Sequence, residues 1–150
     1  MTSLRNYEAL RLLVADERDL SLLSASLQDA VAKLGDFAWR PAERRFAFVA
    51  NRFVWECAHD RKHGPFARVR TGVHFDDVIS VQQQNLRLDV KDAVVELLAI
   101  GFVEGEDGTG TISFDFAGGG AVKLDVEAIN ATLSDISDPW RTRSKPEHDD

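Results

Sequence analysis

Cysteine and long apolar runs are what this sequence has little of. Cys57 is the single cysteine, which excludes an intramolecular disulfide. The longest apolar run, residues 94–103, is about ten residues long and contains Glu96, whereas a membrane-spanning helix needs about 20 apolar residues. No apolar segment of the kind that begins a secretory signal follows Met1. We therefore expect a protein of a reducing compartment, the cytoplasm, that does not span a membrane.

The composition is that of one globular domain. The 150 residues include 44% hydrophobic and 29% charged residues. A chain of this length buries roughly two-thirds of its unfolded surface and needs no disulfide or structural metal to fold. Residues 141–150 have no apolar periodicity and predict a disordered C-terminal tail. We expect a single domain over residues 1–140.

Charge of one sign predominates, but unevenly. The chain has 18 basic and 25 acidic residues, a formal net charge of -7, which disfavours non-specific binding to nucleic acid or to anionic lipid. Residues 37–70 nevertheless contain eight basic and three acidic residues. A basic segment therefore lies in the middle of an acidic protein.

Hydrophobic periodicity predicts one helix near the N-terminus, after a first strand at residues 7–14. Asp16 is placed to cap that helix, and Leu20, Leu23 and Leu27 recur at three- and four-residue steps. We expect this helix to end near Gly35. Residues 127–136 recover helical spacing and predict a short C-terminal helix.

Alternating patterns predict strands through the middle of the chain. Residues 37–40 and 44–55 predict a hairpin with a turn at 41–43. Further strands are expected at 68–75 running on with a bulge to 78–81, at 93–103, at 112–116 and at 122–126. The order predicts an α+β fold with a mostly antiparallel sheet of about seven strands, one helix after the first strand and one C-terminal helix. This element count resembles that of a pleckstrin-homology-like barrel.

Six segments resemble a bacterial family catalogued as domain of unknown function 2948. They are SLQDAV (26–31), GDFAW (35–39), ERRFAFVANRFVWE (43–56), RTGVHF (70–75), VELLAI (95–100) and FAGGGAVKLDV (116–126). The resemblance covers about residues 10–140 and implies no catalytic or binding residue, because none is assigned for the family. The chemistry has to be judged from the residues themselves.

One cluster has the residue types of a metal or thiol site. Cys57, His59 and His63 follow one another at a spacing that brings three zinc ligands within reach on one loop. The cluster lacks a fourth ligand, and no orienting acid accompanies Cys57 as a nucleophile. A polar surface loop is the simpler interpretation. A metal-dependent or thiol enzyme centred on these three residues is our alternative hypothesis.

The basic segment provides the main candidate site. Arg68, Arg70 and His74 share the outward face of one predicted strand, and Arg44 and Arg45 begin a neighbouring strand. Arginine side chains donate paired hydrogen bonds to carboxylates and phosphates. The competing interpretation is that these cations pair with nearby carboxylates at the surface.

We therefore predict a non-enzymatic binding module that uses these five residues to bind a protein partner or a small anionic ligand. We expect no cofactor, and no membrane or nucleic-acid partner, since few aromatic side chains are placed between the arginines to stack on bases. The oligomeric state is left open by the sequence.

Overall fold

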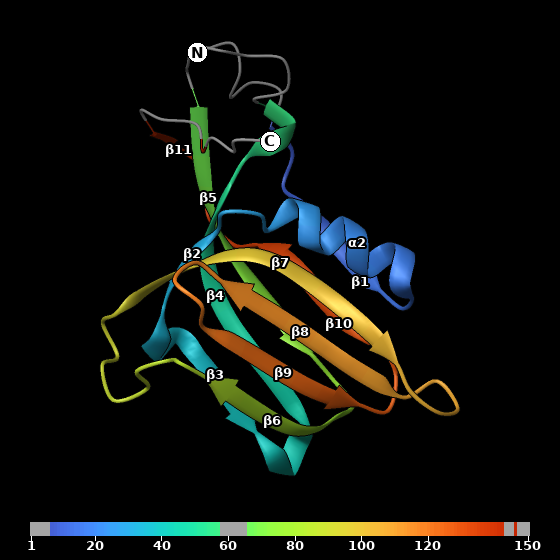
Figure 1. The fold of residues 1–150 in the computed structure, drawn as a ribbon. Coiled ribbons are helices and arrows are strands. Elements are labelled where there is room, and N and C mark those ends of the chain that lie inside the picture. The colour runs from blue at the N-terminus through green and yellow to red at the C-terminus, as the bar shows by residue number, and fades with distance from the viewer. Residues whose placement is uncertain (1–6, 58–65, 143–145, 147–150) are drawn as a thin grey trace.

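The computed structural model describes residues 7–57, 66–142 and 146, and an 11-stranded antiparallel sheet dominates it (Figure 1). The strands are β1 (Arg11–Val14), β2 (Val31–Lys33), β3 (Phe37–Arg40), β4 (Arg45–Phe53), β5 (Phe66–Phe75), β6 (Val78–Gln84), β7 (Val94–Glu104), β8 (Gly110–Phe116), β9 (Ala121–Val126), β10 (Ala131–Asp135) and β11 (Trp140–Thr142). The helical elements are α2 (Glu17–Ser26) and three single 3₁₀ turns, η1 (Leu34–Asp36), η2 (Pro41–Glu43) and η3 (Trp55–Cys57).

The sheet folds back on itself to form two layers. The strand order is β1-β10-β5-β4-β2-β7-β8-β9-β6, with β3 also paired to β4 and β11 to β5. The short strand β2 pairs with β4 on one side and with β7 on the other, so it connects the layers. Figure 1 shows β6, β9, β8 and β7 in front of the long strands β4 and β5.

Aromatic side chains fill the space between the layers. Phe46 and Phe48 of β4 lie with their ring centroids 5.9 Å from that of Phe114 on β8. Phe75 of β5 contacts the same ring edge-on at 5.3 Å. Such tilted and edge-on contacts add to the free energy gained by burying apolar surface. The residues predicted to face inward on β8 and β9 are all buried: Ile112, Phe114, Phe116, Val122, Leu124 and Val126.

Helix α2 begins where the sequence predicted and ends earlier. The Asp16 carboxylate accepts a hydrogen bond from the Asp19 backbone N–H at 2.8 Å, which confirms the N-cap. The helix stops at Ser26, and Asp29 adopts a positive φ of 64°. The predicted continuation to Gly35 is wrong because residues 31–33 form β2, where backbone pairing to two strands replaces helical hydrogen bonds.

The predicted hairpins are confirmed. β3 and β4 pair antiparallel around η2, with Arg44 in the left-handed region at φ 55°. Strands β7, β8 and β9 pair in sequence, and Asp107 and Gly108 form the first turn with positive φ. The expected bulge after residue 75 is a turn at Asp77 (φ 60°) instead, and β6 leaves β5 to pair with β9.

The predicted α+β class, with about seven strands, a C-terminal helix and a pleckstrin-homology-like barrel, is wrong. Residues 131–135 form β10, inserted between β1 and β5, where the expected helix would lie. Ala131 and Leu133 alternate with Thr132 and Ser134, and the two apolar side chains are buried. The helical spacing of the apolar residues in 127–136 predicts a helix, but pairing with β1 and β5 gives this segment backbone hydrogen bonds and burial on both sides.

Two further sequence expectations concern the chain end and the membrane. Arg141 and Thr142, placed in the predicted disordered tail, belong to β11, which pairs with the start of β5. Apart from Pro146, the rest of that tail lies outside the described residues. Within the described part of the chain, no helix is long and apolar enough to cross a membrane.

Candidate functional site

Four of the five predicted site residues lie on the outer face of β4 and β5, and most of them form hydrogen bonds with other groups of the protein. The four are Arg45, Arg68, Arg70 and His74. The Arg45 Nε donates to Asp76 at 2.7 Å, and His74 Nδ1 lies 3.1 Å from the same carboxylate. The hydrogen bond to Asp76 raises the pKa of Arg45. One carboxylate therefore accepts hydrogen bonds from both groups.

The guanidinium groups of Arg44 and Arg68 are already bound to other groups of the protein. Arg44 lies at the turn before β4 and pairs with Glu127, and the hydrogen bond from its guanidinium raises its pKa. Arg68 Nη1 donates to the backbone oxygens of Asp29 and Asn51. Burial lowers the pKa of Arg68. Its charge is used to satisfy backbone carbonyls within the fold.

Arg70 is the most available of the predicted cations. Its side chain is 47% exposed, and its ion pair with Asp36 spans 3.9 Å, which is too long for a hydrogen bond. Arg70 lies opposite Asn51, six residues along β4 from Arg45, and therefore about 20 Å from it at roughly 3.3 Å per residue. The basic residues do not converge on one small anion.

The alternative cluster falls mostly outside the described residues. His59 and His63 belong to residues 58–65, and Cys57 ends η3. Among the residues that the structure describes, no group of three or more His, Cys, Asp or Glu side chains could hold a metal ion. The metal or thiol hypothesis thus stays a prediction.

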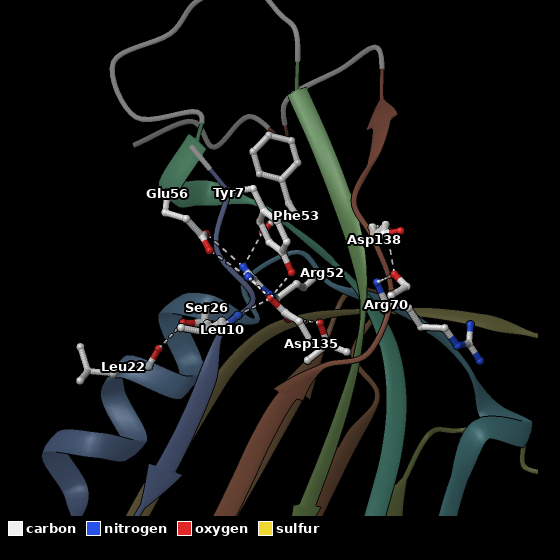
Figure 2. A network of polar contacts seen from close by, with 12 residues as sticks. Tyr7, Leu10, Leu22, Ser26, Arg52, Phe53, Glu56, Arg70, Asp135 and Asp138 are labelled. Carbon is white, nitrogen blue, oxygen red and sulfur yellow. Dashed lines mark hydrogen bonds and ion pairs between the residues drawn. The ribbon is translucent and has the colours of Figure 1, made fainter. Parts of the chain in front are cut away.

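A buried ion-pair network that the sequence did not reveal joins β4, β10 and η3 (Figure 2). Arg52 and Asp135 side chains are both 0% exposed. Arg52 Nε and Nη2 donate to Asp135 at 2.8 and 2.7 Å, and Nη1 and Nη2 donate to Glu56 at 3.0 and 2.8 Å. With a longer contact to the Phe53 carbonyl, all five guanidinium donors are used.

Asp135 is equally saturated. Its oxygens accept hydrogen bonds from the Tyr7 hydroxyl, the Leu10 backbone N–H and the Thr71 hydroxyl at 2.8, 2.8 and 2.9 Å, besides those from Arg52. Burial opposes ionisation of Asp135, but these donors outweigh it and lower its pKa. Burial and the same carboxylate raise the pKa of Tyr7. Because neither charged centre has a free donor or acceptor, we assign the network a structural role.

A largely apolar cavity lies at the other end of the fold. It has a volume of about 460 Å³ and is bounded by η1, β3, the start of β4, β6, the ends of β8 and β9 that face each other, and the connection 85–93. We call it the β3–β6 cavity. Its lining residues are Leu34, Gly35, Phe37, Trp39, Phe46, Val81, Gln83, Leu86, Leu88, Lys91, Phe116 and Val122.

The walls of the β3–β6 cavity are fixed by packing and by backbone hydrogen bonds. Phe37, Trp39, Val81 and Leu86 are partly buried and pack against the main core. The connection 85–93 is attached to η1, because the Gly35 N–H donates to the Lys91 carbonyl at 2.8 Å and the Leu34 N–H to the Ala93 carbonyl at 2.9 Å. The cavity is therefore preformed.

Sequence reasoning missed this cavity because its walls come from segments that lie far apart in the sequence. Local patterns did predict β3 and β6 as strands, but which residues of them meet depends on the pairing of β6 with β9 and on a register shift between Val78 and Ser80. That shift turns Val81 and Gln83 toward the cavity, and nothing in the local alternation specified it.

The comparisons with known proteins identify a family and no function. Residues 10–148 match the family described as protein of unknown function (DUF2948), and the chain belongs to it. No curated protein and no solved structure matches the chain.

Proposed function

We propose that this DUF2948 protein is a non-enzymatic cytoplasmic binding module and that the β3–β6 cavity is its ligand site. The observation that carries the proposal is the cavity's size and lining. Its volume of about 460 Å³ falls in the range of roughly 300–1,000 Å³ typical of small-molecule sites. Four aromatic side chains and five aliphatic side chains line it together with Gly35, and Gln83 and Lys91 are the polar groups.

The lining favours binding over catalysis. A site that performs acid–base or nucleophilic chemistry needs a nucleophile, a base and an orienting group within hydrogen-bond reach of one another. The described residues that line the β3–β6 cavity include no Ser, Cys, His, Asp or Glu. Apolar walls with a few polar groups are instead the usual composition of a site that retains a ligand.

Filling the cavity tests this function. Val81 lines it, whereas the adjacent Gln82 is exposed on the other face of β6. We expect Val81→Trp to abolish binding of N-phenyl-1-naphthylamine, a neutral apolar dye whose fluorescence rises in apolar surroundings, and Gln82→Trp to leave it unchanged. Absence of dye binding by the parent protein, or equal binding by both variants, would overturn the proposal.

The outer face of β4 and β5 is a second candidate, for an acidic protein partner. An open groove of about 770 Å³ follows this face, and Arg40, Arg45 and His74 line it. Arg70 extends the basic surface along β5. Because Arg45 and Arg70 are far apart along the strands, an extended acidic segment fits this face better than a small anion.

Charge reversal tests the second candidate. We expect the parent protein to bind an oligoglutamate peptide, measured by titration calorimetry at low salt, and Arg45→Glu combined with Arg70→Glu to abolish this binding. Arg18 and Lys123 are exposed on α2 and β9, so Arg18→Glu combined with Lys123→Glu is the control with the same net charge. An equal loss in the control would show that only net charge matters.

A further inference from the structure

Lys91 is placed by the backbone at the wall of the β3–β6 cavity. Its carbonyl accepts from the Gly35 N–H, and a Cβ on Gly35 would lie 3.0 Å from the Lys91 Cβ and 3.1 Å from the Lys91 carbonyl oxygen. Glycine at position 35 therefore permits a close approach that a side chain would obstruct. Gly120 allows a similar approach, since its Cβ would lie 2.5 Å from the Leu86 Cδ2. Both glycines let the connection 85–93 close the cavity.

The polar groups of the cavity are donors. Lys91 is the single charged residue among the described lining residues, and no ion pair or hydrogen bond of its ammonium group occurs with the described side chains. The Gln83 Oε1 accepts a hydrogen bond from the Leu86 N–H at 3.2 Å, and this fixes the amide with its NH₂ group available as a donor. A cation and an amide donor together favour an acceptor with negative charge.

The apolar groups define the rest of the ligand. Phe37, Trp39, Phe46 and Phe116 supply aromatic surface, and Leu88 remains 54% exposed at the same cavity. An alkyl or aryl chain would cover this surface and gain the free energy of apolar burial. A single ammonium group balances one negative charge, whereas a phosphate dianion would face a protein of net charge -7 with one cation. A ligand with one carboxylate and an apolar chain fits both the single cation and the apolar walls.

We propose that the β3–β6 cavity binds an amphipathic monocarboxylate, with its carboxylate at Lys91 and Gln83 and its apolar chain against the aromatic walls. This inference rests on the proposed ligand-binding function and names the ligand class. The affinity then depends on both parts of the ligand. Each added methylene raises it about fourfold until the cavity is filled.

Binding of a carboxylate is distinguished from purely apolar binding by the preference of the cavity for decanoate over decanol, which differ only in the head group. We expect decanoate to displace N-phenyl-1-naphthylamine at a concentration about three- to tenfold lower than decanol, both below the concentrations at which they aggregate. The preference should shrink as NaCl is raised, because salt screens a charge pair at the cavity mouth.

Lys91→Met should reduce the preference for decanoate to about one, because it should weaken decanoate binding far more than decanol binding. Lys123→Met is the matched control, because Lys123 is exposed on β9 and does not line the cavity. If Lys91 had only a structural role, Lys91→Met would weaken the binding of decanoate and of decanol equally.

The outcomes distinguish the two proposals. If the dye does not bind the parent protein, the ligand-binding function is wrong. If the dye binds but decanoate and decanol compete equally, or if Lys91→Met keeps the preference for decanoate, the function stands and the carboxylate inference is overturned. Salt-sensitive preference lost in Lys91→Met and retained in Lys123→Met supports it.

Discussion

Replacing Arg52 with Met tests the role assigned to the buried network. Arg52 and Asp135 are both fully buried and joined by two hydrogen bonds of 2.8 and 2.7 Å. Removing Arg52 leaves the Asp135 carboxylate buried without its cation. Breaking a buried pair in this way costs about 3–5 kcal/mol, a large part of the 5–15 kcal/mol that typically stabilises a domain.

Chemical unfolding measures this loss. We expect the free energy of unfolding of Arg52→Met, from urea titration at pH 7, to fall by about 3–5 kcal/mol, with the melting temperature lowered by roughly 6–20 °C for a chain of this size. Arg45→Met is the control: Arg45 is 46% exposed in its pair with Asp76, and its loss should cost less than about 1 kcal/mol.

A second variant keeps the test informative if Arg52→Met does not fold. Combining Arg52→Met with Asp135→Leu removes both buried charges, and the double variant should be more stable than Arg52→Met alone, because the carboxylate that still loses its partner, Glu56, is 44% exposed and no unpaired ion stays buried. A loss below about 1 kcal/mol in Arg52→Met, or a double variant no more stable than Arg52→Met, would refute the assignment of this network to stability.

The pKa of Asp135 is lowered from its ordinary value of 3.8, so the folded state binds a proton at this carboxylate less readily than the unfolded state. The contribution of Asp135 to stability is therefore present above about pH 4 and is lost as the pH falls further. Urea midpoints measured from pH 6 to pH 3 should fall less steeply in Asp135→Asn than in the parent protein. Gly110→Ala should destabilise the protein by about 1–3 kcal/mol, because the new Cβ would lie 2.3 Å from Phe102 Cζ and 2.6 Å from a backbone oxygen; an unchanged thermal midpoint would contradict the close approach. Gly35→Ala should weaken dye binding to the β3–β6 cavity with little change in the melting temperature, because the new Cβ displaces the wall at Lys91. Dye titration of the folded variant checks this.

Several elements were determined by the sequence locally. The Asp16 cap, the turn at residues 41–43 and the alternation in residues 112–126 depend on neighbours within a few positions. Each satisfies its own backbone hydrogen bonds within the helix or hairpin it begins. Arg68, Arg70 and His74 occupy alternate positions of β5 and therefore share one of its faces, as the alternation predicted.

Only the tertiary structure decided the rest. Residues 31–33 and 131–135 are compatible with helix by periodicity, but strands on both sides offer them more backbone pairing and burial than a helix would. Arg52 reads in the sequence as one more surface cation, and its burial depends on Asp135, 83 positions away. The β3–β6 cavity likewise depends on which strands become neighbours. Local sequence sets backbone preference and face alternation, whereas side-chain partners across the sheet are set by pairing between distant segments.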